Sequence, residues 1–225
     1  MPRVVVVGAS FAGLYAAKGL RRAADVVLID ASDEWEYTPS VHEVIGGQRA
    51  PNTILTSMKD VLSGVEFVKG VAVAANESEV RVELGGEMKR LPYDHLIISV
   101  GCSYARPIKA QLGSSDRRAQ LAGAQSMFRD ASSVLVVGGG AVGVEVAGEL
   151  AAGRAVTLTA REDELVRDLP PAARRYALRA LRAQNVRVEL GGGDEERSFD
   201  ARVECYGARP RTGWLADFVD RDARG

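Results

Sequence analysis

The chain has 225 residues, of which 46% are hydrophobic, and it carries a formal net charge of −1 at pH 7. This composition is typical of a globular protein with a substantial core, arranged as one large domain or two small ones. The near-neutral balance gives no electrostatic reason to expect nucleic acid as a partner, and no apolar run approaches the roughly 20 residues that span a bilayer.

The first predicted unit is a strand, a helix and a second strand. The apolar run 4–7 predicts a buried parallel strand over residues 3–8, because helices cover both faces of such a strand. Because the predicted strand begins by residue 3 or 4, we expect no signal peptide. The helix is predicted over 11–22 and the second strand over 26–30. Between the first strand and the helix lies a glycine turn, Gly8-Ala9-Ser10-Phe11-Ala12-Gly13.

A turn of this kind is suited to a dinucleotide phosphate. Its first glycine permits the tight strand-to-helix turn, a small middle residue lets the backbone approach a pyrophosphate, and the last glycine lets helix and strand pack closely. The helix N-terminus adds unpaired N–H groups and a positive dipole end. Asp30 ends the second strand, where a carboxylate can accept hydrogen bonds from the adenosine ribose. The alternative for Asp30 is a turn cap, and we favour the ribose role.

The middle of the chain predicts a small antiparallel sheet. A long loop follows Asp30, and a short helix is expected near 52–62. Three β-like segments, 66–75, 80–84 and 87–91, are separated by polar or glycine turns and predict a three-stranded meander. The apolar run 95–100, which ends at Gly101, predicts a strand that returns to the first parallel sheet.

The second half of the chain repeats the plan of the first. After a crossover with a helix from about 116 to 130, the expected order is strand 133–138, helix 141–152, strand 155–159, helix 171–184, strand 186–190, polar turn 191–197 and strand 200–206. Its glycine turn is Gly138-Gly139-Gly140-Ala141-Val142-Gly143. The repeat predicts an α/β fold of two Rossmann-like, doubly wound dinucleotide-binding domains, the second inserted in the first. The expected boundaries are 1–112, 113–206 and 207–225, the last being the return to the first domain.

The second ribose position differs from the first. Its strand ends in Thr159-Ala160-Arg161, without a carboxylate, although Glu162 and Asp163 follow. An arginine at this place attracts a 2′-phosphate and so favours NADPH, whereas Gly143 as the third glycine is more common with NADH. The two signals conflict, and we expect tolerance of both cofactors. The alternative for Arg161 is a solvated surface charge.

The two cysteines carry no metal or disulfide pattern. Cys102 and Cys205 lie far apart in sequence, each at the end of a strand-like run. Small buried hydrophobic residues are the favoured interpretation, in a protein of a reducing compartment without a structural metal. We expect a cytoplasmic or peripheral membrane protein.

Several motifs of the chain, taken in order, are similar to one family. They are the first glycine turn with Asp30, the run Tyr93 to Gly101, the second glycine turn through Glu145, and Cys205-Tyr206-Gly207-Ala208-Arg209-Pro210. Their order resembles the pyridine nucleotide-disulfide oxidoreductase superfamily. Within it, the segment Glu36 to Val44 is similar to the flavin-side loop of type II NADH dehydrogenases and apoptosis-inducing-factor-like quinone reductases.

The resemblance implies two cofactors, FAD and NAD(P)H. Residues 8–13 and Asp30 would bind the ADP half of FAD, with Ala72 on a strand facing the adenine and Gly101 ending a strand beside the same cofactor. The expected nicotinamide-dinucleotide residues are Gly138, Gly140, Ala141, Val142, Gly143, Glu145 and Arg161. Glu145 would lie near the nicotinamide; an exposed carboxylate favoured by the helix dipole is the equal alternative.

The chain also departs from this family. It has no cysteine before Cys102, so the dithiol chemistry of the disulfide reductases is excluded. Relatives continue past a Gly-x-Arg-Pro turn to a strand ending in Gly-Asp that holds the flavin, and this chain stops at Gly225. We therefore expect a C-terminally truncated member, in which the helix-like piece 214–219 lacks its usual partners.

The favoured function is an FAD-dependent NAD(P)H dehydrogenase. Hydride would pass from NAD(P)H to FAD, and electrons would pass on to a quinone-like small molecule. Hydride transfer needs no side-chain acid or nucleophile, so no catalytic residue is named. The resemblance allows peripheral membrane contact in full-length relatives. The alternative is a truncated, non-catalytic dinucleotide-binding remnant or an incomplete gene product.

Overall fold

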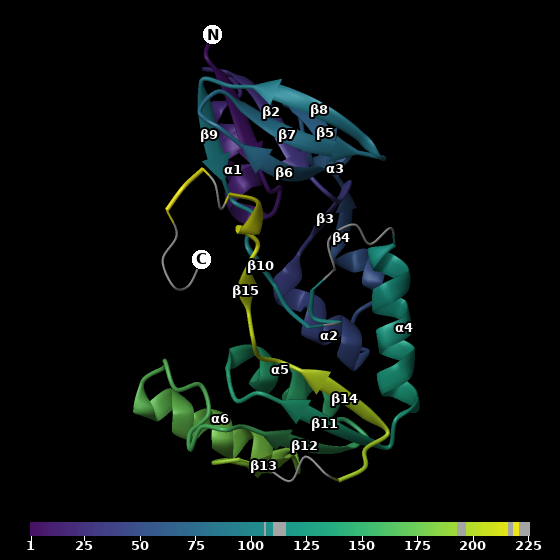
Figure 1. The fold of residues 1–225 in the computed structure, drawn as a ribbon. Helices are drawn as coiled ribbons and strands as arrows, with labels where there is room; N and C mark the ends of the chain where they lie inside the picture. Colours follow the sequence, from purple (N-terminus) through teal and green to yellow (C-terminus); the bar gives the residue numbers. More distant parts are fainter. Residues whose placement is uncertain (106, 110–115, 193–196, 216–217, 221–225) are drawn as a thin grey trace.

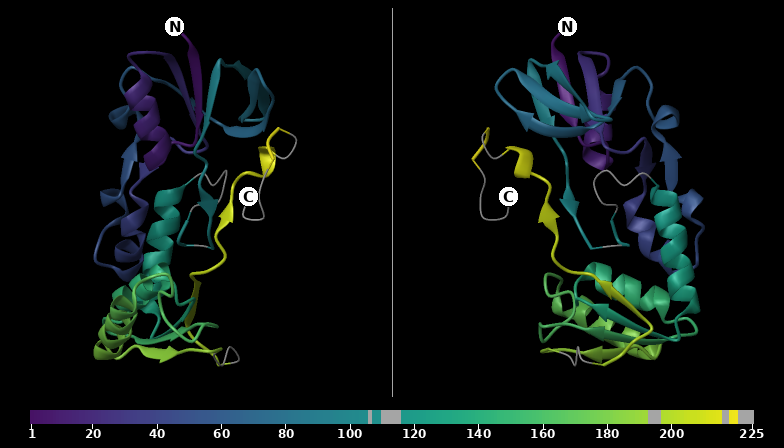
Figure 2. Two further views of the ribbon diagram at one scale, coloured as in Figure 1. Left: turned by 90° about the vertical axis from the view of Figure 1, so that its left-hand side faces the viewer. Right: turned by 45° about the vertical axis from the view of Figure 1, so that its right-hand side comes forward.

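Two parallel sheets lie at opposite ends of the molecule. The computed structural model describes residues 1–105, 107–109, 116–192, 197–215 and 218–220. Figures 1 and 2 show the first parallel sheet and an antiparallel meander at one end and the second parallel sheet at the other, with extended segments running between them. This arrangement confirms the predicted α/β fold with two Rossmann-like units.

The first sheet has the strand order β5-β2-β1-β9. Its strands are β1 (Arg3–Val7), β2 (Asp25–Asp30), β5 (Glu66–Lys69) and β9 (His95–Ile98), all parallel. Side chains of β1 alternate between faces, as the period of a strand requires. Val4 and Val6 pack with Leu14 and Ala17 of helix α1 (Phe11–Leu20). Val5 and Val7 pack instead against the meander, so helix and meander cover opposite faces of the sheet.

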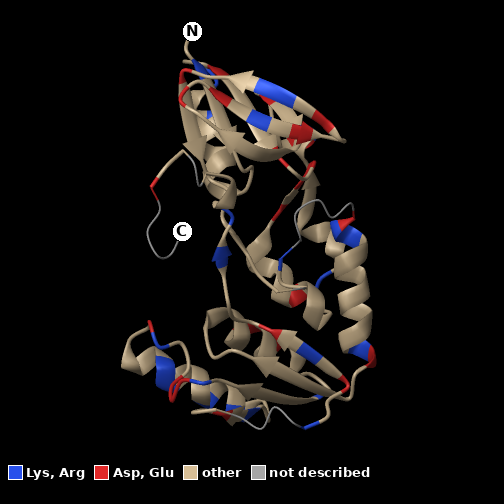
Figure 3. Cartoon of the chain, in the orientation of Figure 1, with Lys and Arg blue, Asp and Glu red and all other residues tan. Residues whose placement is uncertain are grey.

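The meander consists of β6 (Val71–Ala75), β7 (Glu79–Leu84) and β8 (Glu87–Pro92). Its core side chains are Val80, Val82 and Leu91. Its outer face carries interspersed acidic and basic residues (Figure 3), including an ion pair of Arg90 Nη1 with Glu79 Oε1 at 3.4 Å. The prediction of one meander strand over 66–75 is wrong, because Gly70 divides it and its first half joins the parallel sheet.

The segment predicted as a long loop and one helix is more structured than expected. It contains β3 (Glu34–Glu36), the 3-10 turn η1 (Thr38–Ser40), helix α2 (Val41–Gly46), the turn η2 (Pro51–Thr53), β4 (Leu55–Ser57) and helix α3 (Met58–Val61). β3 and β4 pair in antiparallel fashion, so the helix expected over 52–62 is wrong except for its last turn. Leu55, Thr56 and Ser57 pair with β3 instead of forming helical turns, and the Ser57 side chain caps the short helix α3 by accepting the N–H of Lys59.

The second sheet has the order β13-β12-β11-β14, which corresponds strand for strand to the order of the first sheet. Its strands are β11 (Ser133–Val137), β12 (Ala155–Thr159), β13 (Arg187–Glu189) and β14 (Ala201–Glu204), with helices α4 (Arg117–Asp130), α5 (Ala141–Leu150) and α6 (Pro171–Ala183). Each of these strands and helices lies within the range that the sequence predicted for it. Of the predicted polar turn 191–197, residues 193–196 lie outside the described residues.

The core of the second unit draws on the segment before it. Val41, Val44 and Ile45 of α2 pack in one cluster with Leu121 and Phe128 of α4 and with the second sheet. The packing of α2 against both α4 and α5 joins the two halves of the chain. None of the helices in the described ranges combines the length and the apolar character that crossing a membrane requires.

A narrow ribbon returns the chain to its first unit. β10 (Cys102–Ser103) and β15 (Arg209–Pro210) pair in antiparallel fashion, and the turn η3 (Gly213–Leu215) lies against β6. Trp214 packs on the core between first sheet and meander, and Leu215 is buried. The described residues of the piece expected to lack its usual partners are thus packed against the first unit of this chain. It is a short 3-10 turn in its described residues.

Candidate functional site

The two glycine turns have the same backbone construction. The N–H of Gly8 donates to the carbonyl of Ile29 at 2.8 Å, and the N–H of Gly138 donates to that of Thr159 at the same 2.8 Å. Both glycines have positive φ, +98° and +123°. A Cβ on Gly8 would lie 2.4 Å from the Ser99 carbonyl oxygen, and one on Gly138 would lie 2.7 Å from that of Cys205. Only glycine fits at either place.

The last glycine of each turn brings the helix onto the strand. A Cβ on Gly13 would lie 1.7 Å from the Gly8 carbonyl oxygen, and a Cβ on Gly143 would lie 1.9 Å from the Gly138 oxygen. The predicted role of these glycines in close helix packing is thus visible in both units. At the first turn the Ser99 hydroxyl donates to the carbonyls of Val7 and Gly8. These bonds link the start of the turn to the residue that follows β9.

Both helix N-termini are open to an anion. Ser10 caps α1 and Gly140 caps α5 in nearly the same extended conformation, and neither cap has a side-chain hydrogen bond. The first turns of α1 and α5 hold no acidic residue. Beyond its own chain neighbours, no atom of the described residues lies within 4 Å of a Cβ position on Gly140, so this side of the turn is open to a pyrophosphate. These N–H groups and the helix dipoles fit a dinucleotide phosphate.

The first site combines the turn with the end of β2. The N–H of Ala9 donates to Asp30 Oδ2 at 2.7 Å, and the N–H of Ser32 donates to Oδ1 at 2.9 Å. Asp30 is therefore both the turn cap and a carboxylate at the cavity wall, with further lone pairs for a ligand. A cavity of about 200 Å³ is lined by Gly8, Ala9, Ser10, Asp30 and Gly101 among others, and an adjoining one of about 90 Å³ by Ala72.

Side chains from distant segments complete the first site, and sequence reasoning missed them. Trp35 lines the cavity, and its buried Nε1 has no partner among the described residues. Arg117 donates from Nε to Glu36 Oε2 at 2.6 Å and from Nη1 to the Pro107 carbonyl at 2.9 Å. This ion pair, between a buried Arg117 and a half-buried Glu36, ties α4 to β3 beside the cavity. No sequence motif predicts these contacts, because they form between segments that only the tertiary fold brings together.

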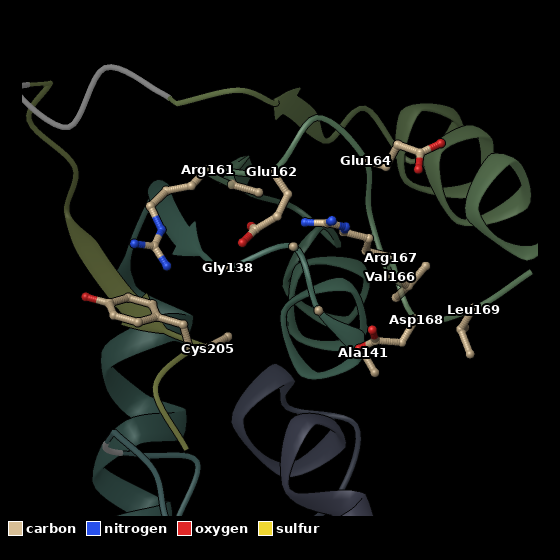
Figure 4. A pocket seen from close by; sticks show the side chains of 14 residues that line it. Gly138, Ala141, Arg161, Glu162, Glu164, Val166, Arg167, Asp168, Leu169 and Cys205 are labelled. Atoms are coloured by element: carbon tan, nitrogen blue, oxygen red, sulfur yellow. The ribbon is translucent and has the colours of Figure 1, made fainter. Parts of the chain in front are cut away.

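The second site is a larger cavity, of about 750 Å³. Gly138, Gly140 and Ala141 of the turn line it together with Arg161. Ala160 occupies the place that Asp30 has in the first site, one residue after the carbonyl that holds the first glycine. Figure 4 shows Arg161, Glu162 and Arg167 reaching towards the space in front of Gly138, with Glu164 turned away from it. Arg167 was not identified from the sequence.

Comparison with known proteins places this geometry in a family. The profile described as "Pyridine nucleotide-disulphide oxidoreductase" matches residues 2–208. The chain belongs to this family. It is 27% identical over 96% of its length to the nitric oxide reductase FlRd-NAD(+) reductase of Aeromonas salmonicida. It is 31% identical over 65% of its length to apoptosis-inducing factor 1 of Saccharomyces cerevisiae. The resemblance stated from the motifs is thereby confirmed.

Solved structures show the same fold. The water-forming NADH oxidase of Lactobacillus brevis, bound to NADH, matches all of this chain with a TM-score of 0.80 at 20% identity, over 58% of its own length. NDH2 of Plasmodium falciparum, in complex with NADH, matches 94% of this chain with a TM-score of 0.77 at 15% identity, over 56% of its own length. The chain also spans 56% of the Aeromonas relative and 39% of the yeast one, about half the length of such family members.

Not every predicted residue of this oxidoreductase chain lines a cavity at its turn. Phe11 and Ala12 lie on the exposed start of α1, where the Phe11 ring stacks edge-on with Trp35 at 5.2 Å between ring centres. Val142 packs against the core of the second unit, and Gly143 is buried on the side of α5 that faces the turn. Glu145 lines an adjoining groove beside α6, which shares Ala141, Val166 and Leu169 with the second cavity, and its Oε2 lies 3.6 Å from Nδ1 of His42 on α2.

The two cysteines of this family member differ from each other. Cys205 is buried beneath Gly138, and burial raises the pKa of its thiol to about 12. It fits the expected small hydrophobic residue. Cys102 is only half-buried, and its Sγ lies 3.4 Å from Nζ of Lys109 at the edge of the first site. The expectation of a buried Cys102 is therefore wrong, because β10 runs in the open ribbon between the units.

Proposed function

We propose that the chain forms the dinucleotide-binding units of an FAD-dependent oxidoreductase that oxidises NAD(P)H and passes electrons to a quinone-like acceptor. The observation that supports it is the pair of glycine turns. The two turns make the same backbone hydrogen bond, but the residues at the end of the following strand differ. One turn has a ribose carboxylate and the other has arginine, so one chain offers two non-equivalent dinucleotide sites.

The first turn is the proposed FAD site. Residues 8–13 would receive the pyrophosphate on the N-terminus of α1, and Asp30 would accept the ribose hydroxyls while keeping its bonds to Ala9 and Ser32. Ala72 and Gly101 would bound the adenosine half. When bound, FAD supplies the two-electron redox chemistry, and the protein supplies position and electrostatics.

The second turn is the proposed NAD(P)H site. Gly138, Gly140 and Ala141 would hold the pyrophosphate at α5, with Arg161 at the adenosine end. Val142 and Gly143 would act by packing the helix against the turn, and Glu145 with His42 would bound the opposite, nicotinamide end. The corresponding domain boundaries are 1–112, 113–206 and 207–225, supported by the sheet membership of residues 3–98 and 133–204.

Spectroscopy of the purified chain tests this proposal. The expected result is a yellow complex after reconstitution with FAD, which NADPH or NADH bleaches under anaerobic conditions and a soluble quinone restores. Asp30→Asn should weaken FAD binding, and Lys18→Gln on the outer surface of α1 is the matched control. Binding of a nicotinamide dinucleotide without any binding of FAD would reject the oxidoreductase function for this chain and favour the non-catalytic alternative.

A further inference from the structure

The groove between α5 and α6 lies on the outside of the second unit. Its volume is about 880 Å³, and Figure 1 shows α6 at the outer edge of this unit. Both walls are largely apolar, and their side chains include Val144, Ala151, Ala173, Ala177 and Leu181. An open apolar surface with polar groups around it is typical of a site where another molecule binds.

Two large side chains are exposed at the edge of this groove. Tyr176 of α6 is 67% exposed, and Leu169, just before the helix, is 46% exposed. The backbone at Leu169 is held in place, because its carbonyl accepts Nε of Arg174 at 2.6 Å and its N–H donates to the Val166 carbonyl at 2.8 Å. An exposed tyrosine beside an apolar groove is suited to anchor a protein contact, and a fixed edge lowers the ordering cost of binding.

Helix α6 carries positive charges that have no partner. Its 13 residues include four arginines and no acidic residue. Arg174 pairs with Glu164, whereas Arg175, Arg179 and Arg182 are exposed and make no hydrogen bond or ion pair within the described part of the chain. Their spacing of four and then three residues places these three arginines on one face of the helix. Because arginine pairs well with carboxylates, this face fits an acidic surface.

Helix α5 provides an acidic surface on the other wall of the groove. Glu145 and Glu149 both line this wall, and the Glu149 carboxylate makes no hydrogen bond or ion pair with the residues that the structure describes. Tyr176 lies on the groove side of α6, whereas Arg175 and Arg179 do not line the groove and lie on the flank away from α5. Within one chain the arginines are therefore turned away from Glu149, so they can pair with it only between two molecules.

We infer that α5 and α6 form the interface of a two-fold symmetric homodimer, in which α6 of each copy lies over the groove of the other. Such an interface requires one surface that is complementary to itself. This surface has both a groove and an exposed Tyr176, and both unpaired arginines and the unpaired Glu149. In the dimer, Tyr176 of each copy packs into the groove of the other, and Arg179 pairs with Glu149 of the second copy. The dimer does not depend on the proposed function, because no cofactor takes part in the contact.

Sedimentation velocity of the full chain, from about 1 to about 200 µM and without added nucleotide, tests this dimer. We expect a monomer–dimer equilibrium with a dissociation constant in the micromolar range. A 13-residue helix is only about 20 Å long, so the contact is smaller than a standard interface. Tyr176→Ala should weaken dimerisation by about tenfold, because it removes the aromatic side chain at the centre of the contact.

An exchange of charges identifies the two walls that meet. Arg179→Glu and Glu149→Arg should each weaken the dimer by at least about tenfold, because each change places like charges opposite one another. The double variant with both changes should recover the affinity of the unmodified chain to within about threefold. Arg22→Glu makes the same change of charge at an exposed turn after α1, outside this surface, and should leave the dimer unchanged.

Three results would overturn the inference. A chain that stays monomeric over the whole concentration range has no such interface. A dimer that Tyr176→Ala and both charge variants leave unchanged uses another surface. If both single charge variants are folded by circular dichroism and weaken the dimer, but the double variant does not recover, Arg179 and Glu149 do not meet across the interface.

Discussion

The two glycine turns differ in how their surroundings are built. The second cavity is lined within 138–206, by one continuous unit of the chain. The first is lined also by Lys109, Arg117 and Arg211, which come from far along the sequence. The turns themselves share the same backbone hydrogen bond from their first glycine, and both helices start without a side-chain cap. The comparison shows that the backbone provides a general phosphate site, and that side chains at the strand ends and walls make each site particular.

The largest expected effect separates the arginines of the two sites. Arg117→Ala should lower the free energy of unfolding by about 4 kcal/mol, because it leaves the half-buried Glu36 carboxylate and the Pro107 and Ile108 carbonyls without their donor. Arg161→Ala removes an exposed side chain and should change stability by less than about 0.5 kcal/mol. Urea denaturation of both variants makes the measurement. Similar losses would mean that the two arginines do not divide into structural and ligand roles.

The next largest effect tests whether the turns are equivalent. Gly13→Ala and Gly143→Ala should each cost about 3 kcal/mol of stability, because the new methyl group would meet the backbone oxygen of the turn. Denaturant midpoints compare them directly. Gly19→Ala, on the exposed face of α1 with open space around it, is the matched control and should stabilise by about 0.5 kcal/mol. A large loss at only one turn would break the comparison.

Local pattern was sufficient to predict most of the parallel strands and both turns. Runs of valine, a glycine turn and the carboxylate Asp30 are near neighbours in sequence, so their geometry follows from the βαβ plan. The walls could not be predicted in this way. Arg117 meets Glu36 only when α4 packs beside β3, and Trp35 belongs to a segment that reads as loop. Such contacts depend on the tertiary fold.

The error at Gly70 has a similar cause. Residues 66–75 have continuous β propensity, and nothing local shows that they belong to two sheets. The chain turns there because the N–H of Gly70 donates to the Asp30 carbonyl at 2.8 Å, while a Cβ would lie 2.6 Å from Val82 Cγ1. The glycine marks a close approach of two layers, which is one of its ordinary uses inside a strand.

A reciprocal exchange would sharpen the comparison at the strand ends. Ala160→Asp gives the second site the carboxylate of the first, placed to accept the N–H of Gly139 as Asp30 accepts that of Ala9. NADP⁺ affinity should fall by about tenfold and NAD⁺ affinity should rise, through repulsion of the 2′-phosphate and a new ribose acceptor. Ala160→Asn keeps the shape without the charge and should lower NADP⁺ affinity less. If the ratio of NADP⁺ affinity to NAD⁺ affinity did not change, the residue at the strand end would have no part in cofactor choice.

The smallest effect concerns an aspartate that accepts backbone N–H groups at the start of β1 and, in the second sheet, at the start of β11. Asp94 Oδ2 accepts the N–H of Arg3 at 2.7 Å, and Asp200 Oδ2 accepts the N–H groups of Ser132 and Ser133 and the Ser133 hydroxyl, at 2.9 to 3.0 Å. These donors, first the Ser133 backbone N–H, hold the pKa of Asp200 below its ordinary value of 3.8. A lowered folded-state pKa contributes stability above pH 3.8 that is lost as the pH falls through the folded value.

Asp200→Asn should therefore lower the melting temperature slightly at pH 7, and the difference from the unmodified chain should shrink as the pH falls below about 4. Asp94→Asn, which loses a single charge-assisted bond, should have a smaller effect at pH 7. Thermal unfolding followed by circular dichroism across this pH range measures both. A difference at Asp200 that persists unchanged in acid would mean that the carboxylate charge does not hold β14 to β11. The two units would then share the construction of their glycine turns but not a stabilising aspartate at the start of the strand.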